Sequence, residues 1–404
     1  MEMDRLSPAE QALIARPDNV AMLHQVEQWA AINSGTRNLE GLGMMAGLLA
    51  DAFASLPGAV SLVDPAPVEA VRPDGSVDAL PHGQHLVVRV RPEAPVRMLF
   101  TGHMDTVFGV DHPFQTLTWR DEGVLNGPGV ADMKGGIAVM LAALQAVEAS
   151  GLQGFGYDVL INSDEEVGSA SSAALIAELA HGKLAAFTYE PSALPDGTLA
   201  GARAGSGNFS IIITGKSAHA GRNPDEGRNA LVAAADIAVR LKALHRQGLS
   251  VNPAKIDGGG PNNVVPDHAV LRVNFRPQTP ADVEYAQSKL AEIIAEVASF
   301  HDVAIHSHGG FNRPPKPMDA PAQKLFDHVK ACGADLGLAI GWKDTGGVCD
   351  GNNIAACGVP VVDTLGVRGG SIHSSDEFMI ADSLAERARL SALAIHRLVS
   401  RGGL

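Results

Sequence analysis

Cysteine is scarce in this chain. Only three cysteines occur among 404 residues, and none belongs to a CxxC pair; they are Cys332, Cys349 and Cys357. Three scattered cysteines exclude a disulfide framework. The sequence therefore predicts reduced thiols and favours a cytoplasmic location.

Positive charge and long apolar runs are also scarce. The formal net charge is −14, which argues against a nucleic-acid partner because such partners need a basic surface. It does not exclude an anionic substrate, since a few local arginines or a metal ion can outweigh the overall charge. Apolar stretches such as IAVMLAALQAV are too short to span a membrane, and the start, MEMDRLSPAEQ, is not typical of a signal peptide. We expect no membrane partner.

The chain contains enough apolar residues for more than one hydrophobic core. Hydrophobic residues make up 46% and charged residues 19% of the sequence, which is typical of a globular protein. Because 404 residues exceed the usual length of a single domain, we expect two domains.

The first half of the chain alternates helical and strand-like segments. Helical patterns occupy residues 8–16, 20–32, 38–56, 134–150 and 169–182, and β-rich runs occupy residues 85–90, 96–103, 157–163 and 185–190. This alternation, with strands that are apolar almost throughout, predicts an α/β fold with a parallel or mixed sheet covered on both faces.

The pattern changes at about residue 204. From there to residue 311 the expected order is β-α-β-β-α-β, which is the order of the ferredoxin-like motif. The proline-rich stretch NRPPKPMDAP (312–321) is typical of a connector, and helices and strands then alternate again. We therefore expect a discontinuous α/β domain of residues 1–203 and 312–404, interrupted by an inserted α+β domain of residues 204–311.

Histidines and carboxylates recur where the predicted strands of the α/β domain end. They are His103 and Asp105, Asp132 in a glycine-rich turn, the adjacent Glu165 and Glu166, Glu190, and His373 in the loop RGGSIHSSDEF. Ligands of open α/β sheets bind at the carboxyl ends of the strands, so these side chains are expected to converge. Clustered carboxylates repel one another unless a cation neutralises them, and this donor set suits zinc or a similar cation.

Their chemistry suggests a site with two metal ions. A histidine and a carboxylate can hold each ion while a further carboxylate bridges both, and such a pair of ions binds a hydroxide and polarises a carbonyl group. Neighbouring side chains diverge, so one of Glu165 and Glu166 can bind metal while the other acts as a general base. Asp105 shares a face with His103 in an extended chain, where it can accept the ring N–H and fix the tautomer.

Five motifs, GHMDTV, GVADMKGG, DEEVGS, YEPS and SIHSSDEF, resemble in this order the signatures of the co-catalytic zinc peptidase and amidohydrolase family. That family includes glutamate carboxypeptidase, acetylornithine deacetylase, succinyl-diaminopimelate desuccinylase and aminoacylase. The resemblance runs from about residue 95 to the C-terminus. It implies an α/β catalytic domain with two Zn²⁺ ions, for which Co²⁺ or Mn²⁺ can substitute, and a homodimer formed through the inserted domain.

The resemblance also implies a role for each motif residue. It implies five metal ligands, two for each ion and one bridging both: His103 with Glu190, Glu166 with His373, and Asp132 between them. Glu165 would be the general base, and the peptide bond after Asp132 would be cis. The stretch GKSAHAG resembles a motif of the inserted domain in which His219 reaches the partner subunit's active site and stabilises the oxyanion.

Three further residues resemble the substrate-binding residues of the family. Arg276 and Asn263 correspond to a pair in the inserted domain, and Arg313 to the arginine by which glutamate carboxypeptidases hold a C-terminal carboxylate. Guanidinium groups suit this task because they bind carboxylates in a bidentate manner. The loop TGGVCDGNNIAACGVP (345–360) departs from the family pattern at Val348 and Cys349, where relatives carry a small hydroxyl residue.

Three functions remain open from the sequence. The first is a carboxypeptidase-type hydrolase that releases an amino acid such as glutamate from a small N-acyl or peptidyl conjugate. The second is an N-acyl-amino-acid deacylase or desuccinylase, and the third is a metal-dependent binding protein without turnover. Glu165 weighs against the third, because a binding protein has no need of a general base beside the ligand Glu166.

Overall fold

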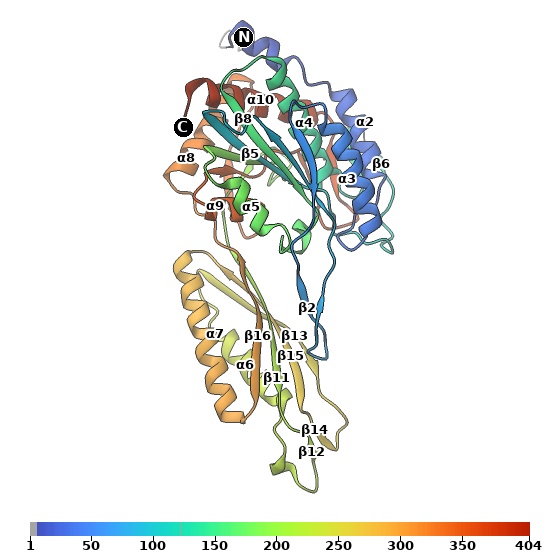
Figure 1. Cartoon of the computed structure of the whole chain (residues 1–404), viewed down its shortest axis with the longest axis vertical. Coiled ribbons are helices and arrows are strands. Elements are labelled where there is room, and N and C mark those ends of the chain that lie inside the picture. The colour runs from blue at the N-terminus through green and yellow to red at the C-terminus, as the bar shows by residue number, and fades with distance from the viewer. Residues whose placement is uncertain (1–5, 122) are drawn as a thin grey trace.

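The computed structural model describes residues 6–121 and 123–404, so the first five residues of the predicted acidic start lie outside the described residues. The molecule is elongated. A larger α/β part, which holds both described ends of the chain, lies at one end, and a smaller part made of a sheet and two helices lies at the other (Figure 1).

A six-stranded mixed sheet forms the centre of the larger part, which confirms the predicted α/β fold with a mixed sheet. Its strand order is β1-β4-β8-β5-β9-β18. The strands β8, β5, β9 and β18 are parallel, whereas β4 is antiparallel to β8 and to β1. The bounds are β1 (Ala59–Val63), β4 (His85–Val90), β5 (Val96–His103), β8 (Phe155–Asn162), β9 (Ala185–Thr188) and β18 (Val361–Val362).

Helices cover both faces of this main sheet. Alternate strand residues face opposite sides, so Phe100 packs in the large core with α4, whereas Leu99 packs in a smaller core with α5 and α9. The helices of this part are α1 (Pro8–Ile14), α2 (Asn19–Ala30), α3 (Leu39–Phe53), α4 (Gly135–Ala149), α5 (Ala173–Ala180), α8 (Ala320–Asp335), α9 (Asp350–Ala356) and α10 (Ser383–Arg401).

One described helical stretch, Val130–Ala149, is long and apolar enough to cross a membrane by length and composition alone. In the fold, 94% of its most apolar window is buried. The stretch ends in α4, which packs against α10 and α2. Its apolar character is therefore explained by its place in the core of the larger part.

A second sheet, with strand order β13-β15-β11-β16, forms the smaller part. Its neighbouring strands are antiparallel, and two helices pack against it around a separate hydrophobic core. The last strand continues to Arg313, two residues beyond the predicted boundary at residue 311. The bounds are β11 (Ser206–Thr214), α6 (Ala230–Lys242), β13 (Leu249–Gly258), β15 (His268–Pro277), α7 (Pro280–His301) and β16 (Ala304–Arg313).

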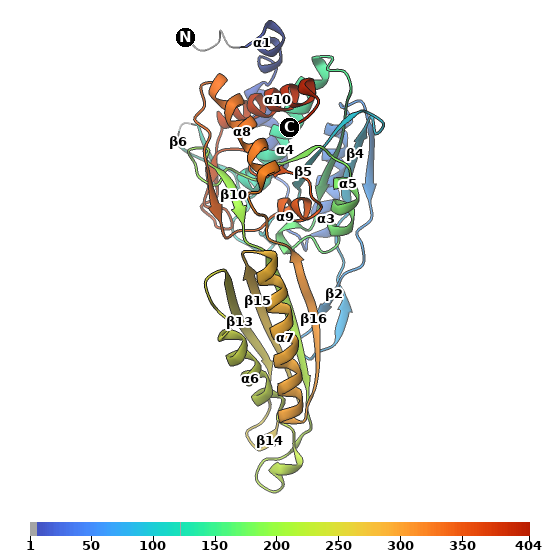
Figure 2. The same cartoon turned by 90° about the vertical axis from the view of Figure 1, so that its left-hand side faces the viewer.

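A hairpin of the larger part reaches the second sheet. Its strand β2 lies alongside that sheet in both views (Figure 1, Figure 2). There Arg272 Nη2 donates to the carbonyl oxygen of Val71 at 2.7 Å, and His268 Nε2 lies 3.1 Å from the carbonyl oxygen of Pro73. The two parts are therefore joined by this hairpin as well as by the chain crossings. The hairpin strands are β2 (Glu69–Val71) and β3 (Val77–Ala79).

Three smaller pairings complete the fold. A four-stranded sheet with the order β19-β20-β7-β6 brings together the segments before Asp132 and on both sides of His373. The strands β10 and β17 form a parallel pair next to the main sheet. The strands β12 and β14 form a two-stranded ladder at the far tip of the second sheet (Figure 1). Their bounds are β6 (Thr118–Asp121), β7 (Val124–Asn126), β19 (Gly369–Gly370), β20 (Phe378–Ile380), β10 (Leu199–Arg203), β17 (Trp342–Thr345), β12 (Ala218–His219) and β14 (Val264–Val265).

Candidate metal centre

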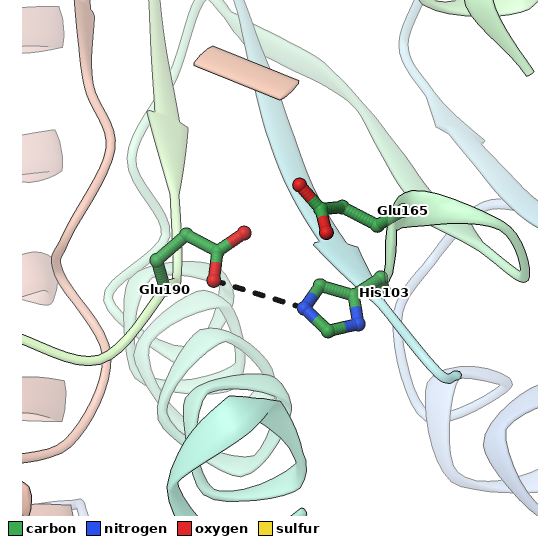
Figure 3. Close-up of side chains that lie close together, drawn as sticks. All are labelled: His103, Glu165 and Glu190. Atoms are coloured by element: carbon green, nitrogen blue, oxygen red, sulfur yellow. Dashed lines mark ion pairs between the residues drawn. The ribbon is translucent and has the colours of Figure 1, made fainter. Parts of the chain in front are cut away.

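Four of the predicted metal ligands and Glu165 lie where segments end at one edge of the main sheet, whereas His373 lies in the loop between β19 and β20. His103 is the last residue of β5, and Glu190 follows β9. Glu165 and Glu166 lie in a single 3-10 turn (Glu165–Val167) after β8, and Asp132 lies just before α4. Figure 3 shows His103, Glu165 and Glu190 pointing toward one another. This convergence is expected where parallel strands end side by side.

Asp132 lies between the two predicted metal positions. Its Oδ1 lies 3.0 Å from His103 Nε2, and its Oδ2 lies 3.3 Å from His373 Nε2. On the outer sides, Glu190 Oε2 lies 3.7 Å from His103 Nε2, and Glu166 Oε2 lies 3.1 Å from His373 Nε2. Each histidine thus has its own glutamate, while one aspartate offers a separate oxygen to each histidine.

The donor atoms are close enough to hold a cation. Atoms of His103, Glu165 and Glu190 all lie within 4.8 Å of one another, and so do atoms of His103, Asp132 and Glu166. Among the described residues, Glu190 Oε1 is buried without a hydrogen-bond partner. A buried carboxylate oxygen is costly unless it is paired or coordinates a metal. The set of imidazole nitrogens and carboxylate oxygens fits zinc and related divalent ions.

Burial and mutual proximity shift the pKa values of these groups. Burial raises the pKa of Glu166 to about 7, and the nearby Asp132 carboxylate adds to the rise. Burial also raises the pKa of Glu190, although His103 opposes it. Hydrogen bonds to Asp132 and Glu166 raise the pKa of His373 to about 11. The carboxylates therefore need positive charge at this place in order to ionise together.

Asp105 organises two neighbours of the predicted metal site. Its carbonyl oxygen lies 2.9 Å from His103 Nδ1, closer than its carboxylate, which lies at 3.4 Å. The carboxylate instead accepts hydrogen bonds from the backbone N–H groups of Glu165 and Glu166 at 3.1 and 3.2 Å, and from Thr36 Oγ1 at 2.7 Å. Asp105 thus fixes the turn that carries both glutamates and orients His103 mainly through its main chain.

Arg313 contacts the predicted general base directly. Its Nη2 lies 2.8 Å from Glu165 Oε1, donates to Ser169 Oγ at 2.8 Å, and lies 3.5 Å from Asp350 Oδ1. Burial raises the pKa of Glu165, and the Arg313 guanidinium opposes this rise. Arg313 is only 5% exposed, so these contacts of Nη2 are made inside the protein. No motif or pattern along the chain predicts this contact.

A cavity of about 870 Å³ opens above these carboxylates. Besides His373, its lining includes the arginine and lysine side chains of Arg203, Arg276, Arg313 and Lys343. Asp363 holds Arg203 by two contacts of 2.8 and 3.1 Å. In contrast, Arg276 bonds only to the neutral Asn274, at 3.0 Å, and neither it nor Lys343 forms an ion pair within the described part of the chain. Val348 and Cys349, at which the loop 345–360 departs from the family pattern, also line this cavity.

Two predicted site residues lie elsewhere. His219 on β12 and Asn263 just before β14 are exposed at the far tip of the second sheet, away from the main sheet (Figure 1). His219 Nδ1 accepts from the backbone N–H groups of Gly221 and Arg222 at 3.1 and 3.2 Å, and the carbonyl oxygen of Asn263 accepts from Ala220. A single chain does not bring these two residues to the predicted metal site.

Glu377 is a buried acidic residue at this site. No functional role was predicted for it from the sequence. Its carboxylate accepts three backbone hydrogen bonds from the Gly129–Asp132 turn. The peptide bond that follows, between Asp132 and Met133, is cis, as the family resemblance implies. The signal for Glu377 was present in the motif SIHSSDEF, from which only His373 was assigned a role.

Comparisons with known proteins identify the class to which this fold and site belong. Residues 99–397 match the family model described as peptidase family M20/M25/M40. The chain belongs to this family, and it is a metal-dependent hydrolase of amide bonds.

The relatives include both carboxypeptidases and desuccinylases. Carboxypeptidase G2 from a Pseudomonas species is 29% identical, with 94% of this chain and 90% of the relative covered. A succinyl-diaminopimelate desuccinylase from Psychrobacter arcticus is 31% identical over 74% of this chain and 78% of its own length. A tripeptidase structure from Staphylococcus aureus has the same fold, with a TM-score of 0.72 at 24% identity, covering 96% of this chain and 100% of that chain.

Proposed function

We propose that this protein is a dinuclear zinc carboxypeptidase-type hydrolase that releases an amino acid such as glutamate from an N-acyl or peptidyl conjugate. Co²⁺ or Mn²⁺ would be able to replace Zn²⁺. The observation that carries the proposal is that Asp132 offers one oxygen toward each histidine, beside the separate carboxylate of Glu165. A carboxylate shared by two ions suits the short spacing of two-metal sites, and a further carboxylate beside them can act as the general base.

In this proposal each polar residue has one task. His103, Glu190, Asp132, Glu166 and His373 would hold the metal ions, which when bound lower the pKa of water and polarise the amide carbonyl. Glu165 takes a proton from the attacking water and returns it to the nitrogen of the leaving amine. Arg313 orients the Glu165 carboxylate through its contact of 2.8 Å, and Asp105 fixes the turn beneath it.

The proposal places the substrate's carboxylate near Arg276. This guanidinium lines the cavity and has no carboxylate partner among the described residues, so it is free to bind a carboxylate in a bidentate manner. Lys343, on the β17 wall, adds a second cation of this kind. Arg313 lies deeper, and a substrate carboxylate would reach it only by competing with Glu165. An anionic substrate therefore fits the chain despite its net charge of −14.

We further propose that the protein works as a homodimer in the cytoplasm. Residues 204–311 would form the dimer contact, and His219 and Asn263 of one subunit would complete the active site of the other. The position of both residues at an exposed tip, away from their own chain's carboxylates, supports this proposal. His219 would then stabilise the oxyanion that develops on the amide carbonyl.

A deacylase that acts on N-acyl or N-succinyl amino acids is the alternative. Similarity to the Psychrobacter arcticus desuccinylase favours it, and so does the departure of the cavity-lining loop at Val348 and Cys349. The two functions use the same predicted metal site and differ only in the side of the scissile bond that is recognised.

A substrate panel separates these functions. Release of free amino acid would be measured on dipeptides and on N-acetyl, N-succinyl and N-benzoyl amino acids, with Zn²⁺, Co²⁺ or Mn²⁺ added in turn. Preference for a C-terminal glutamate that is lost in Arg276→Ala supports the carboxypeptidase. Preference set by the acyl group and insensitive to Arg276 supports the deacylase. Hydrolysis of none of these amides by metal-loaded protein would contradict both.

A further inference from the structure

We propose that Glu377 is a positioning residue that fixes the two loops carrying Asp132 and His373 relative to each other, and that it thereby sets the affinity of the site for its metal ions. The inference rests on the proposed two-metal function. It concerns a residue that binds neither metal nor substrate in that proposal, and it is carried by hydrogen bonds on two sides of Glu377.

Both carboxyl oxygens of Glu377 accept hydrogen bonds from the loop that carries Asp132. Its Oε1 accepts from the backbone N–H groups of Ala131 and Asp132 at 3.0 and 3.1 Å, and its Oε2 accepts from the N–H of Gly129 at 3.2 Å. The residue is 1% exposed. A buried carboxyl group that accepts from three donors is held in one position, because any other position would leave the donors and the carboxyl oxygens without partners.

The chemistry of this loop requires an acceptor at this point. Gly129, Ala131 and Asp132 precede α4 and direct their N–H groups at one place, and no side chain of the loop itself caps them. A carboxylate is the strongest available acceptor for backbone N–H groups near a helix start. A glutamine of the same size would place an N–H₂ group against at least one of these donors. Both acceptor oxygens of Glu377 and the shape of its side chain are therefore used.

The main chain of Glu377 connects to the other ligand loop. Its own N–H donates to the carbonyl oxygen of Ser374 at 3.0 Å, which closes a tight turn directly after His373. Its carbonyl oxygen accepts from Asn126 Nδ2 at 2.5 Å, and Phe378 pairs with Asn126 between β20 and β7. The turn that directly follows His373 is thus closed by the same residue that holds the Asp132 loop.

These contacts bear on the spacing between the predicted metal positions. Asp132 Oδ2 and His373 Nε2 lie 3.3 Å apart, and both belong to loops that meet at Glu377. The ions of two-metal sites lie roughly 3.5–4 Å apart, so small loop shifts change their coordination. Replacing residues that orient metal ligands typically costs roughly 10–100-fold in metal affinity.

The test is metal binding by the folded protein, measured without reference to turnover. Wild type, Glu377→Gln and Glu377→Asp would be stripped of metal and titrated with Zn²⁺ against a chromophoric chelator. Asp376→Asn is the matched control, because it removes one carboxylate charge from the adjacent, exposed residue, whose carboxylate pairs with Arg120 on the outside of the protein. We expect about a tenfold or greater loss of Zn²⁺ affinity for both Glu377 variants and less than a twofold change for the control.

A second readout separates positioning from simple stabilisation. With saturating Zn²⁺, kcat of Glu377→Asp should return to within a few-fold of wild type, whereas the midpoint of metal activation should shift by the same factor as the affinity. Variants that melt at a lower temperature yet bind Zn²⁺ with wild-type affinity would overturn the inference. If wild type itself binds no divalent ion, the proposed function fails, independently of Glu377.

Discussion

The floor of the cavity and the far tip of the second sheet differ in how completely one chain determines them. At the floor, Asp132, Glu165 and their neighbours are buried and held by several side-chain and backbone contacts. At the tip, His219 and Asn263 are exposed and their contacts are to adjacent loop residues. Both regions carry residues that the family resemblance assigns to one active site.

The difference between the floor and the tip follows from burial. A buried cluster of carboxylates is costly, and it is retained because the surrounding backbone donors and a cation compensate for it. The tip is exposed and needs no such compensation, and in the proposed dimer its histidine acts on the second chain. We therefore expect substitutions at the floor to act within one subunit and substitutions at the tip to act on the neighbouring subunit.

The largest effect is expected at Glu165. Glu165→Gln keeps the size of the side chain but cannot accept a proton, so kcat should fall by about a thousandfold or more. Zinc content measured by mass spectrometry should stay at the wild-type value, because Glu166 and the other predicted ligands are unchanged. Full activity in this variant would remove Glu165 from the role of base, and loss of zinc would make it a ligand.

A smaller effect is expected at the tip. His219→Ala should lower kcat by about a hundredfold, since one oxyanion-stabilising donor contributes that much, without loss of metal or of the dimer. The control is His306→Ala, which replaces an exposed histidine on β16 of the second sheet and should be neutral. Steady-state kinetics and light scattering on both variants measure this, and a wild-type rate for His219→Ala would contradict the role.

Two arginines of the cavity are expected to affect different kinetic constants. Arg276→Ala should raise KM about tenfold for substrates with a free carboxylate and change kcat little, because it removes a contact made equally in the ground and transition states. Arg313→Ala should instead lower kcat, because it removes the partner of Glu165 at 2.8 Å. If KM rises in both variants and kcat falls in neither, Arg313 binds substrate and does not orient the base.

Much of the fold was predictable because it depends on short-range patterns. Strands such as β4 and β5 begin and end at the predicted residues, and helices such as α4 lie within one residue of the predicted bounds. The convergence of His103, Glu165 and Glu190 followed from the rule that ligands gather at the carboxyl ends of parallel strands. These inferences needed only periodicity and the order of elements along the chain.

Other features depend on pairings between distant segments, which no local pattern reveals. The contact between Arg313 and Glu165 joins residues 148 positions apart, and Glu377 reaches back to the Gly129–Asp132 turn. Asp105 was expected to orient His103 by its carboxylate, yet its carbonyl oxygen lies closer. The β2–β3 hairpin that reaches the second sheet was also not foreseen. Such details follow from tertiary packing alone.

Complementation between subunits tests the central claim most directly. Glu165→Gln and His219→Ala proteins, each nearly inactive, would be mixed, exchanged into random dimers and assayed. If the tip acts on the neighbouring subunit, half of the dimers are mixed and each contains one intact site, so activity should return to roughly a quarter of wild type. A mixture that stays as inactive as its parents would contradict an active site completed by the partner's His219.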